Sequence, residues 1–403
     1  TLPFIALIPI LFYIYLIIPI YINPPNIDKD SFFGSGEAHK DDETVYPYLI
    51  DLSTQVREMR RMAQESINEV DEGTFERRIW SFLSDFNWDS HAHFINSFPH
   101  YKTQIEGLSI HFIHTEIKHQ EKVKVIPILL LPASFSGFWS FIKILPILSN
   151  PSRYGFDFGI RDTLVFNVVI PSYPMSLFSD SPSNQTKVDN LSVSRIINKL
   201  MTDRLSYSKF FIFGDGGIGS EIASTISTLY PSSVSGLIIR DPTATVQGIR
   251  NTLQLYFLRS DSIETKMPLP THFPRIEDES FAVSLRYIID RYGESSFSPD
   301  LDREITLDEI STSFSFFLLT NSLRSHIDLL DTTLSHSTLH ATTTVPTFVI
   351  SSTISKFHVP KSLLAHTFLN LTRYDEIDGG ILYPLSKSTE LAKKIFSFVE
   401  LYV

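Results

Sequence analysis

The sequence predicts an α/β fold in which helices cover both faces of a mostly parallel sheet. Short apolar runs alternate with helix-like stretches after Thr103, and this alternation is typical of such sheets. A long, mostly helical stretch from Pro242 to about His340 interrupts the alternation. Two further strand-like runs and a closing helix then follow. A sheet that is interrupted by a helical insertion and then resumed suggests an α/β-hydrolase fold with a lid.

Composition narrows the function classes. The chain has 403 residues, of which 43% are hydrophobic, so a sizeable core is expected. The net charge is −11, from 34 basic and 45 acidic residues, which argues against a nucleic-acid partner. There is no cysteine, and this excludes disulfides, thiolate metal sites and cysteine nucleophiles.

The first 22 residues, Thr1 to Ile22, carry no charge and are long enough to cross a bilayer as a helix. A secretory signal peptide is the alternative. The run is long for the apolar part of such a peptide, however, and no small-residue cleavage pattern follows it. We therefore expect a single-pass membrane anchor over residues 1–22, with the lipid bilayer as a partner, and a polar linker over residues 23–45.

The pattern of apolar residues divides the rest of the chain into four segments. A helical region is expected over residues 46–102, the first half of the α/β core over 103–241, the lid over 242–340 and the second half of the core over 341–403. Seven apolar runs are the expected strands, namely 108–114, 125–131, 163–172, 209–217, 234–241, 343–352 and 369–378.

Several segments resemble the microsomal-type epoxide hydrolases, a family that includes juvenile hormone epoxide hydrolases. FPHYKTQIEGLSIHFIH, Phe98 to His114, resembles the signature that precedes the family's first core strands. Further segments keep the family's order: 85–88, 95–96, 138–148, 171–174, 209–223, 305–309 and 345–347. The resemblance implies an α/β-hydrolase fold, hydrolysis of epoxides to diols, and an endoplasmic-reticulum membrane location with a cytosolic globular domain.

The resemblance also implies a specific mechanism. In the family, an Asp on a sharp strand-to-helix turn attacks the epoxide carbon, and two lid tyrosines donate hydrogen bonds to the opening oxygen. A His that is oriented by an acid then activates water to hydrolyse the ester. Backbone N–H groups of an H-G-W-P-G segment face the developing charge.

This sequence departs from that pattern at each position that can be aligned. The family's nucleophile, assisting acid, one lid Tyr and base fall, in that order, on Gly216 (or Gly217), Ser355, Leu330 and Ile381. The oxyanion segment reads PASFS, Pro132 to Ser136, and has lost both glycines. PSYPMSL, Pro171 to Leu177, has lost glycines as well. The catalytic set is therefore expected to be lost and the chain's own activity to be absent.

Asp215 is the acid that remains in the Gly-rich run FIFGDGGIGS, Phe211 to Ser220. Phe213 stands two residues before it, where a tight elbow needs a small residue, so we expect Asp215 to cap the following helix rather than to attack a substrate. A triad of Asp215, Asp241 and His358 can be written, although no spacing demands it. The run has no following Lys and no Walker pattern, so no cofactor is expected.

Other motifs give weaker signals. No G-x-S-x-G occurs, so a serine esterase is not supported. His91-Ala92-His93, and the pair His111 and His114, are interpreted as ordinary polar residues, because strand residues three apart face opposite ways. Three N-x-S/T sites, at Asn184, Asn190 and Asn370, matter if the domain is lumenal.

Three hypotheses remain. The first is a pseudoenzyme that binds an apolar small-molecule ligand or acts as a scaffold beside membrane proteins. The second is a divergent epoxide or ester hydrolase that uses Asp215 and a relocated His. The third is a structural subunit of a membrane complex, which an extended surface patch on the N-terminal helical region would indicate.

Overall fold

The computed structural model describes residues 23–29, 31–33, 41–118, 121–133, 136–159, 161–182, 188–242, 305–335, 342–353, 361–380 and 382–403. The expected anchor over residues 1–22 lies outside these ranges. Among the helices that the structure describes, none has both the length and the apolar composition needed to span a bilayer.

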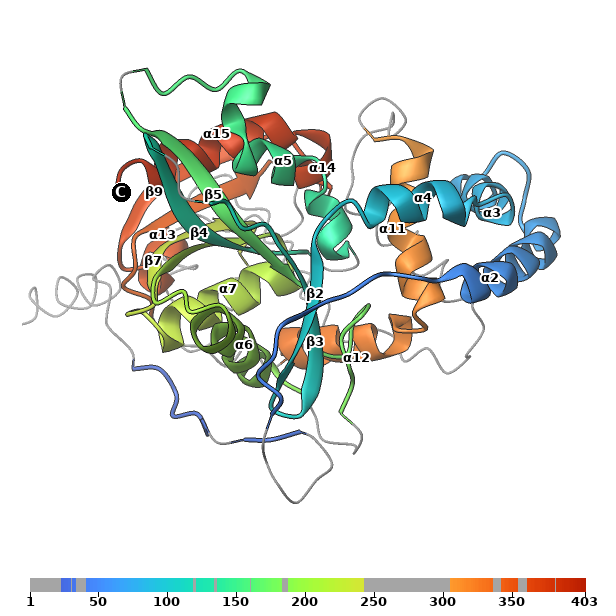
Figure 1. The fold of residues 1–403 in the computed structure, drawn as a ribbon, viewed down its shortest axis with the longest axis horizontal. Helices are drawn as coiled ribbons and strands as arrows, with labels where there is room; N and C mark the ends of the chain where they lie inside the picture. The colour runs from blue at the N-terminus through green and yellow to red at the C-terminus, as the bar shows by residue number, and fades with distance from the viewer. Residues whose placement is uncertain are drawn as a thin grey trace, which may run out of the picture.

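A single mixed sheet organises the described part of the chain (Figure 1). Its nine strands are β1 (Tyr46–Pro47), β2 (His100–Ile105), β3 (Leu108–His114), β4 (Val123–Leu131), β5 (Thr163–Pro171), β6 (Phe210–Gly214), β7 (Val234–Arg240), β8 (Thr347–Ser352) and β9 (Leu371–Ile377). They lie in the order β1-β2-β3-β5-β4-β6-β7-β8-β9. The pairs from β5 to β9 are parallel, and those from β1 to β5 are antiparallel.

All seven expected strands are confirmed, but β1 and β2 were missed. The region expected to be helical, residues 46–102, contains β1 and the start of β2, and Tyr46 and Pro47 pair with β2. The sequence of β2, HYKTQI, alternates only loosely between buried and exposed positions, so its period is hard to recognise. Its partner β3 lies directly after it in a hairpin, and the pairing rather than the local pattern defines the strand.

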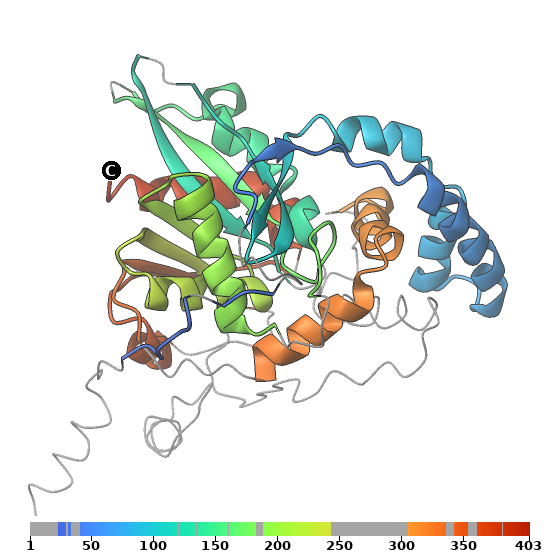
Figure 2. The ribbon, with the colours of Figure 1, turned by 60° about the horizontal axis from the view of Figure 1, so that its bottom comes forward.

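Helices cover both faces of the sheet, as expected (Figure 1). Those of the core are α5 (Ile144–Ser149), α6 (Asn190–Lys199), α7 (Ile218–Leu229), α13 (Lys361–Thr367), α14 (Tyr383–Ser386) and α15 (Ser388–Val399). Beyond the sheet lie α2 (Ser53–Ser66), α3 (Phe75–Ser84), α4 (Trp88–Ile95), α11 (Leu307–Leu319) and α12 (Leu323–Ser335). Figure 2 shows α11 between the N-terminal helices and the core.

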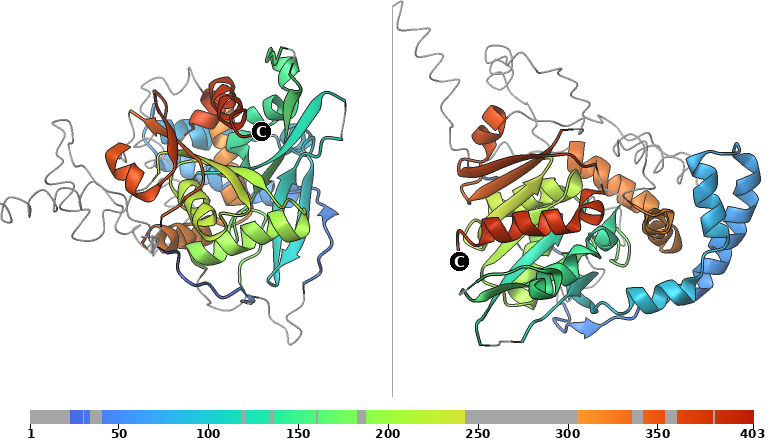
Figure 3. Two further views of the ribbon diagram at one scale, coloured as in Figure 1. Left: turned by 90° about the vertical axis from the view of Figure 1, so that its left-hand side faces the viewer. Right: turned by 90° about the horizontal axis from the view of Figure 1, so that it is seen from above.

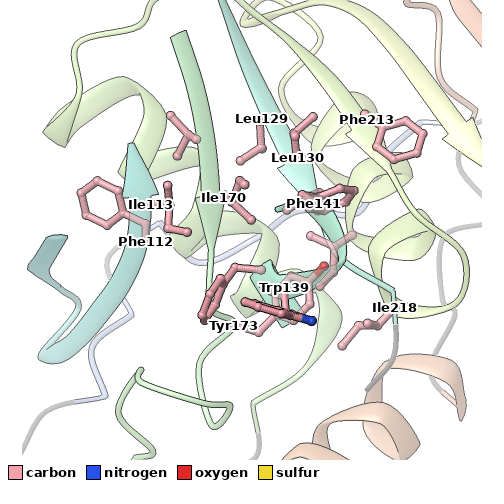
Figure 4. Packing of buried hydrophobic residues seen from close by; sticks show 14 of the residues in the cluster. Phe112, Ile113, Leu129, Leu130, Trp139, Phe141, Ile170, Tyr173, Phe213 and Ile218 are labelled. Atoms are coloured by element: carbon pink, nitrogen blue, oxygen red, sulfur yellow. The ribbon is translucent and has the colours of Figure 1, made fainter. Parts of the chain in front are cut away.

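The parallel strands are apolar on both faces because helices bury both. Leu129 and Leu130 are fully buried in β4, and so is Phe213 in β6. Figure 4 shows these side chains beside those of β3 and β5, with Trp139 and Tyr173 near the end of the sheet. The core therefore holds the carboxyl ends of the parallel strands at one edge, where a site is expected in open α/β sheets.

The hairpin between β2 and β3 is fixed by charged groups. Glu106 and Gly107 both have positive φ, 54° and 80°, as a two-residue hairpin turn requires. Their N–H groups each donate to the carboxylate of Asp41, at 2.7 Å. The buried Glu106 carboxylate accepts two hydrogen bonds of 2.7 Å from Arg195. The hairpin is thereby attached to α6 and to the segment that precedes β1.

Two buried histidines connect α4 to the sheet. His100 Nε2 donates to the carbonyl of Ile95 at 3.0 Å, and His100 Nδ1 lies 3.0 Å from His111 Nε2. His111 Nδ1 lies 2.9 Å from the hydroxyl of Ser172. Neutral rings satisfy every contact, since each ring then donates once and accepts once. Burial lowers the pKa of His100 to about 4, and that of His111 well below its usual range.

We expect acid to destabilise the protein through these rings. Because the pKa of His100 is depressed on folding to about 4, its contribution is complete above the unfolded-state value and is lost as the pH falls toward 4. For His100 alone, the free energy of unfolding should fall by about 1.5 kcal/mol between pH 6.5 and pH 5. Urea unfolding at several pH values measures this fall.

The matched variants are His100→Phe and, as a control, His93→Gln at an exposed position of α4. The pH slope should be shallower in His100→Phe and unchanged in His93→Gln. A wild-type slope in His100→Phe would show that the buried pair does not cause the acid sensitivity.

Candidate functional site

The carboxyl ends of β6, β7 and β8 meet at one edge of the sheet, and polar groups gather there. Asp215 follows β6, Arg240 ends β7 and is followed by Asp241, and Ser352 ends β8. The segment 378–380, which follows β9, comes to the same place. The sheet thus brings together the turn and the loop on which the family resemblance places the nucleophile and the base.

The connection from β6 to α7 is a tight strand-to-helix turn built on glycines. Gly217 precedes the helix with a φ of +69°, which a residue with a side chain rarely adopts. A Cβ atom at Gly219 would lie 2.5 Å from the carbonyl oxygen of Leu131 and 2.7 Å from that of Pro132. Gly219 is therefore required by the close approach of α7 to the end of β4, and Gly217 by its positive φ.

Asp215 lies in this turn and is completely buried. Its backbone N–H donates to the carbonyl of Leu131 at 2.9 Å, and its carboxylate Oδ1 accepts a hydrogen bond from Arg240 Nε. The prediction that Asp215 caps α7 is wrong, because Gly217 is the N-cap residue and no side chain caps the helix. The carboxylate of Asp215 instead accepts a hydrogen bond from Arg240, at the end of the neighbouring strand β7.

Arg240 joins three segments with one buried side chain, whose exposure is 2%. Besides Asp215, it contacts the carboxylate of Asp241 (Nη1 to Oδ2, 2.7 Å) and the carbonyl of Gly380 (Nη1 to O, 3.2 Å). Asp241 in turn accepts a hydrogen bond from the backbone N–H of Ser352 at 2.6 Å. The turn after β6, the ends of β7 and β8, and the segment after β9 are held together in this way.

The cluster of Asp215, Arg240 and Asp241 places two carboxyl groups against one guanidinium, away from water. Burial raises the pKa of Asp215 above its ordinary value, and the attraction of Arg240 opposes that rise. The second carboxylate oxygen of Asp215, Oδ2, has no hydrogen-bond partner among the described residues. An arrangement of this kind fixes the chain at the site.

The structure places the aligned family positions as follows. A Cβ atom at Gly216 would lie 3.3 Å from Arg240 Nη2, so the guanidinium lies against the position counted as the nucleophile. Leu330 is fully buried in α12. Ile381, Ser355 and His358 lie outside the described residues, as do residues 134–135 of the oxyanion segment.

The backbone around the oxyanion segment keeps left-handed positions although the glycines are gone. Met175 and Leu177 have φ values of 67° and 53°. Non-glycine residues in this conformation cost about 1–3 kcal/mol each and persist where surrounding contacts impose them. The N–H of Met175 donates to the carbonyl of Asp180, and the N–H of Leu177 donates to the hydroxyl of Ser322, both at 3.0 Å.

The histidine motifs have local partners. His111 and His114 face opposite sides of the sheet, as predicted, with the hydroxyls of Ser172 and Tyr207 as their respective partners at 2.9 and 2.8 Å. His91 contacts Asp308 of α11 at 2.8 Å. In the described part of the chain, no three His, Asp or Glu side chains come together in a group that could hold a metal ion.

The glycosylation motifs differ in accessibility. Asn190 is 2% exposed at the start of α6, which closes it to modification in the folded chain. Asn370 is exposed in the turn before β9, and Asn184 lies outside the described residues.

A shallow depression of about 480 Å³ lies away from the strand ends, where α3 and α4 meet the N-terminus of α11. Its lining residues are Arg78, Ser81, Phe82, Asp85, Phe86, Asn87, His91, Leu307 and Asp308. Both nitrogens of the His91 ring contact oxygen atoms, so this histidine is not free to act as a base toward a neighbouring hydroxyl.

The fold and the strand-to-helix turn define an α/β-hydrolase-fold protein. Comparison with solved structures agrees. The crystal structure of juvenile hormone epoxide hydrolase from the silkworm Bombyx mori superposes with a TM-score of 0.78 at 21% identity, over 93% of this chain and 99% of that one. Aspergillus niger epoxide hydrolase gives 0.67 at 19% identity, over 93% and 100% of the two chains.

A family model described as epoxide hydrolase N terminus matches residues 46–141. Juvenile hormone epoxide hydrolase 2 of Ctenocephalides felis is 25% identical over 274 residues, which are 64% of this chain and 57% of the relative. Epoxide hydrolase 1 of Sus scrofa is 31% identical over 217 residues, 51% and 46% of the two chains. The alignments thus span about half the length of these relatives. These matches support an epoxide hydrolase family member, with the family model confined to residues 46–141.

We expect Arg240 to be essential for stability. Arg240→Met leaves two buried carboxylates without their cation and should lower the free energy of unfolding by about 3–5 kcal/mol. Asp215→Leu combined with Arg240→Met should cost less than Arg240→Met alone, because the combination removes one of the carboxylates as well. Denaturant unfolding of the two variants measures the difference.

Arg61→Met is the matched control, since Arg61 also contacts two acids, Glu58 and Glu65, but on the exposed face of α2. Water screens that contact, so its loss should have little effect. Equal losses in Arg240→Met and Arg61→Met would mean that the buried cluster does not hold the site together.

Proposed function

We propose that this chain is a non-catalytic member of the epoxide hydrolase family that binds an apolar ligand or acts as a scaffold beside membrane proteins. One observation carries the proposal: Asp215, the acid of the nucleophile turn, is fully buried and paired with Arg240. A nucleophilic carboxylate needs an oxygen that is aimed at a substrate carbon. Pairing with the Arg240 guanidinium makes the Asp215 carboxylate a weaker nucleophile. Burial keeps a substrate from reaching it.

The position aligned with the family's base supports the same proposal. It falls on Ile381, next to Gly380, whose carbonyl accepts a hydrogen bond from Arg240. An ester formed on a carboxylate would have no aligned imidazole to activate water for its hydrolysis. Arg240 joins the former nucleophile turn to the former base loop, so a ligand is expected on the lid side of the cluster rather than against Asp215.

The lid over residues 242–340, the anchor over 1–22 and the endoplasmic-reticulum location belong to the same proposal. Helices α11 and α12 support the lid, since they lie in that range and α11 lies beside the core (Figure 2). The uncharged run at the start of the sequence supports the anchor. A role as a structural subunit of a membrane complex remains a variant of the scaffold function.

A divergent hydrolase that uses Asp215 and a relocated His is the second candidate. It is favoured by Asp215 Oδ2, which has no hydrogen-bond partner among the described residues. This mechanism requires Arg240 to leave Oδ1 when substrate binds, and it requires a histidine at the strand ends.

The test is single-turnover incubation of the purified full chain with a panel of apolar epoxides, followed by intact mass and diol analysis. We expect neither a covalent adduct nor a diol, because Asp215 is buried and paired. An active relative such as the Bombyx mori enzyme is the positive control. An adduct on Asp215, or diol formation that Asp215→Asn abolishes, would falsify the pseudoenzyme proposal and support the divergent hydrolase.

Membrane attachment is tested separately. We expect the full chain to stay with the membrane fraction after alkaline carbonate extraction, and a chain that begins at residue 23 to be released. The reason is that residues 1–22 supply an uncharged span long enough for the hydrocarbon core of a bilayer. Retention of the shortened chain would instead place the membrane contact on the globular part.

A further inference from the structure

His91 joins two parts of the molecule that are far apart in sequence. It lies on α4, in the group of helices that precedes the sheet, and its Nε2 atom lies 2.8 Å from Oδ1 of Asp308, in the first turn of α11. Figure 3 shows that group of helices beside α11, at one side of the core. The two residues are separated by 217 positions along the chain.

The hydrogen bonds of this ring require a particular protonation state. Its Nδ1 atom lies 2.7 Å from the carbonyl oxygen of Asn87, and its Nε2 atom faces the Asp308 carboxylate. A carbonyl and a carboxylate both accept hydrogen bonds. A neutral imidazole has one N–H and can donate to only one of them, whereas the doubly protonated ring donates to both. Double protonation of the ring would therefore satisfy both contacts.

The surroundings hold the ring in place. Its centroid lies 4.4 Å from that of Phe86 and 6.4 Å from that of Phe82, and its side chain is 16% exposed. Aromatic neighbours also favour a cation. The ring is accessible enough to exchange protons with solvent, and its orientation is nevertheless fixed.

Other charged groups near the ring come from every element that packs there. Arg78 and Asp85, from α3 and the residue that ends it, line the same depression as His91 and Asp308. From α2, Arg60 donates to the carbonyl of Phe86. On α11, Glu309 is already paired with Lys143. Asp308 is thus the acid of α11 that contacts the ring.

We propose that His91 is a protonation-dependent clasp between the N-terminal helices and α11. When the ring is protonated it holds both the Asn87 carbonyl and the Asp308 carboxylate. The singly protonated ring can donate to only one of these two acceptors at a time, so the contact with Asp308 is made less often and the first turn of α11 opens more often. This inference does not depend on the proposed function.

Hydrogen exchange of the full chain, read by mass spectrometry on peptides that cover residues 305–312, tests the clasp. Rates are corrected for the pH dependence of intrinsic exchange. At pH 6 we expect about fivefold greater protection in wild type than in Asp308→Asn, and less than a twofold difference at pH 8.5. Asp308 also interacts with the dipole of α11 at its N-terminus, and that contribution is the same at both pH values.

His91→Gln separates the two effects, because it leaves the N-terminus of α11 unchanged. Its protection should not vary between pH 6 and pH 8.5. Glu65→Gln, at an exposed ion pair on α2, is the control and should behave as wild type. The proposal is overturned if Asp308→Asn has the same effect at both pH values, or if His91→Gln keeps the wild-type pH dependence.

Discussion

The buried guanidinium of Arg240 is the constraint on which the carboxyl edge of the sheet depends. It holds Asp215 of the turn after β6, Asp241 at the end of β7 and the carbonyl of Gly380 after β9. Charges removed from water are costly unless they are paired, so none of these groups can move without exposing or replacing the others. Each charged group of the cluster thus keeps the others in place. The cluster lies at the carboxyl ends of the strands, where enzymes of this architecture bind their substrates.

The backbone around the strand ends is held by packing contacts that do not involve catalytic side chains. Gly219 is needed because α7 approaches the end of β4 closely, and Gly217 because its φ is positive, whatever residue stands at the tip of the turn. Met175 and Leu177 keep positive φ although they have side chains. These packing contacts do not depend on catalytic side chains, and a shared fold does not establish activity.

Features that depend on neighbouring residues in the sequence were predicted correctly, whereas features that depend on residues far away in the sequence were missed. The parallel strands β4 to β8 are continuous apolar runs, so they could be recognised without knowing their neighbours. Strand β2 is polar and depends on its pairing with β3, so it was missed. The cap predicted for Asp215 failed because its partner, Arg240, lies 25 residues away, and local pattern carries no information about that contact. The motif GLIIRD, 236–241, contained the partner, although an arginine at a strand end is more often a surface residue.

Exposure explains why two ionic clusters in one chain can have opposite roles. The guanidinium of Arg240 stays charged at any pH that the protein experiences, and its surroundings are dry, so its contacts are permanent. The imidazole of His91 reaches water and contacts an acid whose side chain is 51% exposed, so its contact is weaker. A permanent cluster suits the fixing of a strand edge. A weaker contact between two helices that are distant in sequence suits the reversible clasp proposed for His91 and Asp308.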